Sequence, residues 1–215
     1  MSTTDRFQIE RQLQREGCSA IAGVDEAGRG PLAGPVLVAA VVFPGEWIQH
    51  GIPDRYQKLN DSKAISERAR ERFFDLLISD EEVISSIVAV EAPEIDELNI
   101  LNATHHGMVR ALQGLTCEPD HVLVDGLPVK LIETTQTALV KGDSKSYSIA
   151  AASVLAKVTR DRQMVAYDKK YPGYGFARHK GYPTQVHLEA LRDLGPCPIH
   201  RTSCRPVREQ QMDLW

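Results

Sequence analysis

Apolar runs alternate with amphipathic stretches along this chain, in the pattern of a mixed α/β domain. Apolar runs rich in valine and bounded by Gly and Pro predict buried strands at residues 20–25 and 35–43, because strands covered on both faces show no polar alternation. Residues 83–90 predict a third strand. Two shorter apolar runs, HVLVDG and TALVKGD, predict strands that stop at Asp125 and at Asp143.

Amphipathic stretches predict helices between and after these strands. Residues 64–78 place apolar side chains at helical spacing behind Ser66, which suits an N-cap. Further helices are expected over 93–115 and over 148–170, where a run of small residues allows close packing on a sheet. A last helix follows Pro183, and no internal repeat or low-complexity segment is present.

The composition is that of an ordinary soluble protein. The 215 residues suit one domain, or one domain with a small appendage, and 42% of them are hydrophobic. No apolar run reaches the roughly 18 to 20 residues of a membrane span, and the polar N-terminus does not resemble a targeting signal. The four cysteines lack metal-site spacing, so we expect reduced thiols in a cytoplasmic protein that is a monomer.

Charge is distributed unevenly along the chain. Residues 1–140 hold 12 Lys and Arg against 22 Asp and Glu, whereas residues 141–215 hold 13 against 7. The basic C-terminal third could form a positive face that meets nucleic acid. Equally, these lysines and arginines could only solvate helix surfaces.

Acidic residues recur where predicted strands end. Asp25 and Glu26 close the first strand, and Asp125 and Asp143 close two later ones. Ligands collect at strand ends in open α/β sheets. Each aspartate alone also suits a turn, so the prediction depends on the recurrence. Asp25 and Glu26 can share a site only if their strand is already ending at Gly28, since strand neighbours point to opposite faces.

Grouped carboxylates need a cation. Without one they repel, and some must stay protonated. Oxygen ligands suit a hard divalent ion such as Mg²⁺, which also accepts phosphate oxygens, and no Cys/His cluster offers a zinc site.

Six motifs resemble bacterial ribonuclease HII in order and in approximate spacing, over residues 20 to 207. They read AGVDEAGRGPLAGPV, LNDSK, EIDELNI, VLVDG, VKGD with AAASVLAKVTRD, and YGFARHKGYPT. The resemblance implies an α/β ribonuclease H-like fold, with a central mixed sheet flanked by helices and a C-terminal helical part. It also implies an endonuclease that cleaves the RNA strand of RNA–DNA hybrids and cuts on the 5′ side of single ribonucleotides in duplex DNA.

The resemblance assigns roles to residues of this chain. The family's four catalytic acids are matched by Asp25, Glu26, Asp125 and Asp143. In the family these acids hold Mg²⁺ or Mn²⁺ for a two-metal-ion hydrolysis, which leaves a 3′-hydroxyl and a 5′-phosphate. The motif that recognises the ribonucleotide is matched by Gly28, Arg29 and Gly30. Tyr182 matches a tyrosine that stacks on the sugar of the next deoxynucleotide, although a half-buried aromatic residue capping the last helix is the simpler interpretation.

Further polar residues suit phosphate contacts or a solvated surface: Lys63, Lys145, Ser153 and Lys180, of which Lys63 and Lys180 are the preferred substrate-binding candidates. Asp161 is interpreted as a helix salt-bridge or packing partner.

Three segments are expected: an N-terminal extension over 1–18, the catalytic domain over 19–207 and a flexible tail over 208–215. The tail resembles a motif that docks bacterial enzymes on the sliding clamp, formed here by Gln211, Met212, Asp213, Leu214 and Trp215. Alternatively, the tail packs back on its domain or is frayed.

Two other functions were weighed against the nuclease. An actin-like phosphotransferase needs two copies of the fold and glycine-rich phosphate loops, and this sequence has neither. A non-catalytic nucleic-acid-binding protein on the same fold has no use for four carboxylates, which would repel the polyanion.

Overall fold

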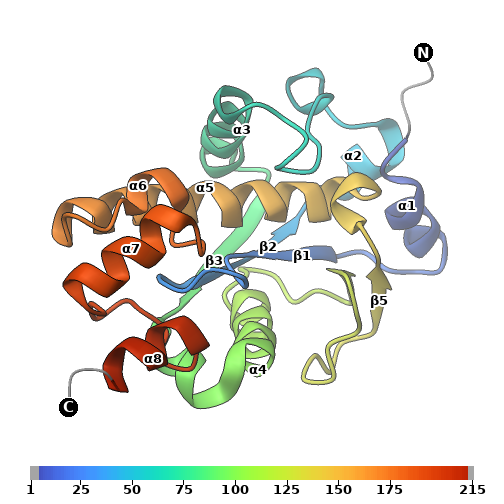
Figure 1. Ribbon diagram of the computed structural model, residues 1–215. Helices are drawn as coiled ribbons and strands as arrows, with labels where there is room; N and C mark the ends of the chain where they lie inside the picture. The colour runs from blue at the N-terminus through green and yellow to red at the C-terminus, as the bar shows by residue number, and fades with distance from the viewer. Residues whose placement is uncertain (1–4, 213–215) are drawn as a thin grey trace.

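The computed structural model describes residues 5–212, and their strands form one mixed five-stranded sheet (Figure 1). The sheet order is β3-β2-β1-β4-β5, with β1 antiparallel to β2, β2 antiparallel to β3, and β1, β4 and β5 parallel. The strands are β1 (Ile21–Ala27), β2 (Val36–Val42), β3 (Ile84–Val90), β4 (His121–Asp125) and β5 (Gln136–Leu139). The carboxyl ends of the three parallel strands therefore meet at one edge.

Helices cover both faces of the sheet, and a helical part follows at the C-terminus (Figure 1). The helices are α1 (Gln8–Arg15), α2 (Gly45–His50), α3 (Glu67–Ser79), α4 (Ala92–Gln113), α5 (Tyr147–Lys170), α6 (Phe176–His179), α7 (Gln185–Leu194) and α8 (Arg205–Met212), with short 3₁₀ turns η1 (Asp54–Tyr56) and η2 (Gly142–Ser144). This architecture confirms the predicted ribonuclease H-like fold class. Among the described residues, no helix is long and apolar enough to cross a membrane.

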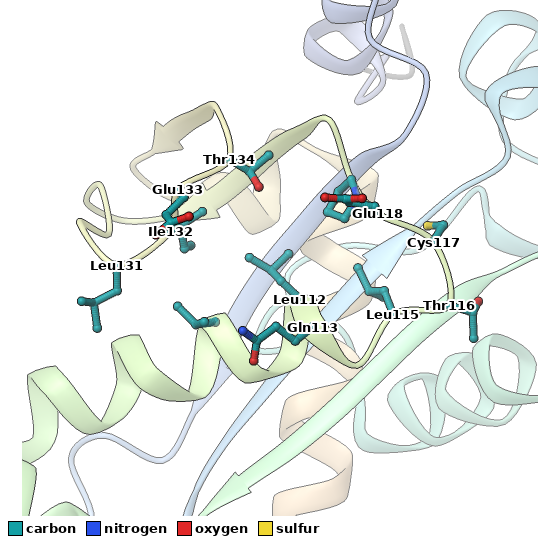
Figure 2. A pocket seen from close by; sticks show the side chains of 12 residues that line it. Leu112, Gln113, Leu115, Thr116, Cys117, Glu118, Leu131, Ile132, Glu133 and Thr134 are labelled. Carbon is teal, nitrogen blue, oxygen red and sulfur yellow. The ribbon is translucent and has the colours of Figure 1, made fainter.

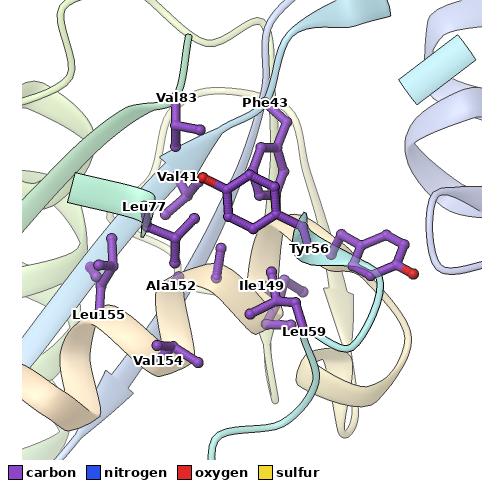
Figure 3. Close-up of a cluster of buried hydrophobic side chains, with 14 of the residues drawn as sticks. Val41, Phe43, Tyr56, Leu59, Leu77, Val83, Ile149, Ala152, Val154 and Leu155 are labelled. Atoms are coloured by element: carbon purple, nitrogen blue, oxygen red, sulfur yellow. The ribbon is translucent and has the colours of Figure 1, made fainter. Parts of the chain in front are cut away.

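Two hydrophobic clusters explain why the central strands lack polar alternation. In β2, Leu37 and Val41 join the cluster under α3 and α5, whereas Val36 and Val38 join the cluster over α4. Figure 3 shows the first cluster, in which side chains from β2, α3 and α5 pack together. Both faces of β2 are thus covered, and all seven of its residues are buried.

Close packing of α5 on β1 sets the position of the site. The predicted small residues of α5 are fully buried, and Gly23 faces them from β1. A Cβ at Gly23 would lie 2.3 Å from the carbonyl carbon of Ser148, so only glycine permits this approach. The start of α5, and η2 just before it, are thereby held against the end of β1.

Helix α1 was not predicted, because its sequence is almost entirely polar. It is anchored by Phe7, which is fully buried, and by Glu10, which accepts hydrogen bonds from Ser146 and Ser148 at the start of α5. The segment expected as an extension therefore packs against the element that follows Asp143. At the other end, α8 crosses the predicted boundary at residue 208, and the clamp-like motif at 211–215 lies at and beyond the end of the described residues.

Candidate active site

Three of the four predicted acids come together at the edge where the parallel strands end. Asp25 lies near the end of β1, Asp125 is the last residue of β4, and Asp143 lies in η2 after β5. One carboxylate oxygen from each lies within 4.8 Å of the others. The Gly142 amide donates a 2.6 Å hydrogen bond to Asp125 Oδ1, which ties η2 to β4.

Glu26 lies outside this group of three. Strand β1 continues to Ala27, and Glu26 still pairs in register with Val38, so its side chain leaves the opposite face from Asp25. Its Oε1 lies 3.3 Å from Nη1 of Arg29. Glu26 nevertheless lines the same cavity as Asp25.

Burial and like charge dominate the electrostatics of the acids. Burial raises the pKa of Asp25 well above its usual range, and the carboxylates of Glu26 and Asp125 raise it further. Burial, followed by Asp61 and Asp125, raises the pKa of Asp143 to about 6. Burial also raises the pKa of Glu26, against the opposing effect of Arg29.

The three clustered carboxylates fit a hard divalent cation. Within the described part of the chain, no lysine or arginine forms a salt bridge with Asp25, Asp125 or Asp143. An uncompensated group of this kind is costly unless a cation binds or protons stay on it. Carboxylate oxygens are the ligands that Mg²⁺ and Mn²⁺ prefer.

Metal removal should make stability fall as pH rises. Acids whose pKa is raised on folding stabilise the protein below their unfolded pKa of about 4, and this contribution is lost as pH rises through about 6 for Asp143. A cation binds the deprotonated acids and reverses the loss. Metal at 100 times its Kd contributes about 2.7 kcal/mol, which raises Tm by roughly 5–10 °C in a domain of this size.

The measurement is the difference in Tm between Mn²⁺ and EDTA, which should be larger at pH 7.5 than at pH 5. An equal difference at both pH values would show that the acids do not bind the ion.

A cavity of about 380 Å³ opens beside the acids. It is lined by Asp25, Glu26, Ala27, Gly28, Arg29, Gly30, Ser62, Lys63, Ser153, Lys157, Arg160 and Tyr182. The structure thus gathers five of the six predicted substrate-binding residues around one space. Tyr182 is 42% exposed and lines this cavity, so its side chain is accessible there.

Lys180 is the predicted substrate-binding residue that does not line this cavity. Its Nζ donates to the carbonyl of Ala177, and its own carbonyl accepts from Arg160. Lys180 adopts the left-handed backbone conformation, with φ of 53°, at the end of α6. In this arrangement Lys180 shapes the turn before Tyr182, and its contact with phosphate stays a prediction.

The Gly-Arg-Gly segment turns its carbonyls inward and leaves its amides free. Arg201 donates to the carbonyls of Gly28 and Arg29, at 2.6 and 3.0 Å. Within the described residues, the N–H groups of residues 28–30 have no hydrogen-bond acceptor. Gly28 has φ of 101°, and a Cβ there would lie 2.1 Å from Nε of Arg160, so this position requires glycine.

Two buried arginines that sequence reasoning missed hold this segment. Arg160 and Arg201 are each 1% exposed, and among the described residues neither forms a salt bridge with a carboxylate. Arg160 donates to the carbonyls of Ala33, Pro35 and Lys180, and its guanidinium lies 5.9 Å from the ring centroid of Tyr182. Nothing in the sequence distinguishes these arginines from solvated ones, because their partners are backbone carbonyls far away in the chain.

A larger cavity, of about 580 Å³, lies away from the acids (Figure 2). It is formed by the last turn of α4, the segment 115–119 and the segment 131–134. Leucine and isoleucine side chains form much of its wall, with Glu118 and Glu133 among them. It offers no cluster of catalytic groups, so the smaller acidic cavity is the candidate active site.

Comparison with known proteins agrees with this choice. A family model described as Ribonuclease HII matches residues 22–207. A curated Ribonuclease HII from Moorella thermoacetica is 54% identical over 197 residues, which is 92% of each chain.

Two solved structures share the fold. Ribonuclease H2 from Pyrococcus horikoshii OT3 has a TM-score of 0.74 and 30% identity, and covers 90% of this chain and 98% of its own. The PCNA:RNase HII complex from Archaeoglobus fulgidus has a TM-score of 0.68 and 25% identity, over 85% and 93% of the two chains.

Proposed function

The chain belongs to the ribonuclease HII family and is a ribonuclease H enzyme, and from this premise we propose its substrates and chemistry. The proposed reaction is hydrolysis of the RNA strand in RNA–DNA hybrids, and of the bond on the 5′ side of a single ribonucleotide in duplex DNA. The observation that carries the proposal is the cluster of Asp25, Asp125 and Asp143 beside a cavity that residues 28–30 line, whose amides have no acceptor within residues 5–212.

The acids hold the metal ions in this proposal. Asp25, Asp125 and Asp143 would each offer a carboxylate oxygen, and Glu26 lines the same cavity as Asp25. When bound, two Mg²⁺ or Mn²⁺ ions supply an activated water and stabilise the departing 3′ oxygen of an in-line displacement. Lys63 lines the cavity and brings positive charge to the approaching phosphates, whereas the charge of Lys157 is paired with Asp161.

The walls of the cavity recognise the sugars. The free N–H groups of residues 28–30 can donate to a 2′-hydroxyl, the group that distinguishes RNA from DNA. The exposed ring of Tyr182 forms the neighbouring wall and stacks on the next, deoxy sugar. Gly30 and Tyr182 are adjacent, since a Cβ on Gly30 would lie 3.5 Å from Cε1 of the ring.

The proposal is tested with three labelled substrates: an RNA–DNA hybrid, a DNA duplex with one ribonucleotide and an all-DNA duplex. Each is incubated with the protein in Mg²⁺, Mn²⁺ or EDTA. We expect cleavage of the first two only, and only with a divalent ion. Binding without cleavage under every condition would favour the alternative of a non-catalytic nucleic-acid-binding protein.

A sliding clamp is the proposed protein partner, through the motif at 211–215. The complex of an archaeal ribonuclease HII with PCNA supports a partner of this kind. Leucine and tryptophan side chains of a short tail are suitable anchors for a hydrophobic pocket, and the ordering entropy of such a tail makes the binding weak.

A variant that ends at Gln210 should keep its cleavage activity and lose binding to the bacterial clamp. Intact and truncated proteins are titrated against the clamp in parallel, with hybrid cleavage as the control. Identical titrations would rule out docking through the tail.

A further inference from the structure

A chain of hydrogen bonds runs from the segment after α7 to the backbone of Tyr182. The amide of Cys197 donates to Nδ1 of His200 at 2.9 Å, and Nε2 of His200 lies 3.1 Å from Nε2 of His187. Nδ1 of His187 lies 2.9 Å from the carbonyl oxygen of Tyr182. His187 is fully buried and His200 is 3% exposed, so water does not compete for these bonds.

The partners fix the tautomer of each ring. A carbonyl only accepts, so His187 must carry its proton on Nδ1, and its Nε2 is then an acceptor. His200 must therefore donate from Nε2, which leaves its Nδ1 free to accept from Cys197. All three bonds are satisfied when both rings are neutral, and only in this pair of tautomers.

The same segment also holds the Gly-Arg-Gly segment, which lines the cavity next to Tyr182. Arg201, the next residue after His200, donates to the carbonyls of Gly28 and Arg29. Adjacent residues thus hold the backbone of the Gly-Arg-Gly segment and, through His187, the backbone of Tyr182. We propose that the His200–His187 pair is a positioning device that sets the distance of the Tyr182 ring from the ribonucleotide-reading segment.

This proposal deepens the proposed function and rests on it. The hydrogen-bond chain reaches Tyr182 at its backbone carbonyl, so the backbone of Tyr182 is fixed while its ring stays accessible to a sugar. The third histidine of the cluster supports the same turn, because Nδ1 of His179 accepts from the amide of Gly181.

The surroundings keep the pair neutral. His179 stacks on His187 with ring centroids 4.5 Å apart, and Phe176 packs edge-on against His187. Burial, followed by His187, lowers the pKa of His200 to about 4, and burial lowers the pKa of His187. A proton added to Nε2 of His187 would set two N–H groups against each other at 3.1 Å. A proton added to Nδ1 of His200 would instead set its N–H against the amide of Cys197 at 2.9 Å.

Nitrogen-15 NMR of the free protein tests the hydrogen-bond chain without activity. We expect His187 as the Nδ1–H tautomer and His200 as the Nε2–H tautomer at pH 7, with the exposed His106 as the reference for a solvated ring. The Nε2–H tautomer at His187 would overturn the proposal, because the bond to Tyr182 could not then exist.

Kinetics test the positioning role. His187→Leu should lower kcat/KM on the single-ribonucleotide duplex as much as Tyr182→Ala does, roughly 5- to 150-fold if the whole stacking contribution is lost. The double variant should be no worse than either single one. His187→Asn, whose Nδ2 can replace Nδ1 as the donor to Tyr182, should restore most of the activity.

If the losses of kcat/KM add in the double variant, or if His187→Asn and His187→Leu lose kcat/KM equally, the histidine pair has only a packing role and the proposal is wrong. Circular dichroism checks whether each variant is folded. If His187→Leu is unfolded, the activity of His187→Asn and the tautomers measured by NMR test the proposal instead. Failure of the wild-type protein to cut the single-ribonucleotide duplex would contradict the proposed function instead, and would leave the NMR result standing.

Discussion

Asp125→Asn should abolish cleavage and leave hybrid binding largely intact. Asparagine keeps the Oδ1 that accepts from Gly142, so the link between β4 and η2 survives. One negative charge and one metal ligand are lost from the group of three. Removing one preorganised group that stabilises a transition state lowers kcat by about 10² to 10³-fold, and we expect at least this loss.

The measurements are kcat on a labelled hybrid in Mg²⁺ and hybrid affinity in EDTA. Asp193→Asn is the matched control, because Asp193 is exposed on α7, outside the acidic cavity. The control should behave as the wild type does. Full activity of Asp125→Asn at ordinary Mg²⁺ concentrations would refute the proposed role of the cluster.

Tyr182→Ala should lose cleavage at single ribonucleotides more than it loses duplex affinity. Stacking of an aromatic ring contributes roughly 1–3 kcal/mol to base contacts, and we expect a similar contribution to the sugar contact here. This corresponds to a roughly 5- to 150-fold lower kcat/KM on a duplex with one ribonucleotide. An all-RNA strand lacks the deoxy sugar at that position, so its cleavage should fall less.

Tyr182→Phe is the control for this prediction. Among the described residues the Tyr182 hydroxyl has no hydrogen-bond partner, so phenylalanine should retain the selectivity. The ratio of kcat/KM values on the two substrates is the measured quantity. An equal loss on both substrates would assign Tyr182 a structural role only.

The elements that sequence analysis predicted are those whose signal is local. Uninterrupted valine runs marked the central strands, and Ser66 caps α3 by accepting from the amide of Ala69. Asp161 is the predicted helix salt-bridge partner, paired with Lys157. Asp25 and Asp125 meet because parallel strands bring their carboxyl ends to one edge, as the recurrence of acids indicated. The prediction that a strand stops at Asp143 was wrong, because β5 ends at Leu139 and Asp143 joins the group from η2.

The features that were missed depend on contacts distant in the chain. The partners of Arg201 lie more than 160 residues away, and those of Glu10 lie more than 130 away. The role proposed for His187 and His200 depends on the hydrogen bond between them and on the tautomers that their partners fix, which the sequence does not show. The alternation of side chains along a strand warned that Asp25 and Glu26 could separate, and the structure leaves Glu26 outside the group of three while keeping it in the same cavity.

The position and chemistry of the cut test the central claim most directly. A duplex with one ribonucleotide, labelled at either end, is digested in Mg²⁺, and the new termini are identified by mass. Hydrolysis by water on the 5′ side, which ions held by the acids would promote, predicts a 3′-hydroxyl on the preceding deoxynucleotide and a 5′-phosphate on the ribonucleotide. A 2′,3′-cyclic phosphate on the ribonucleotide would contradict the account, because it requires the 2′-hydroxyl as nucleophile and a cut on the other side.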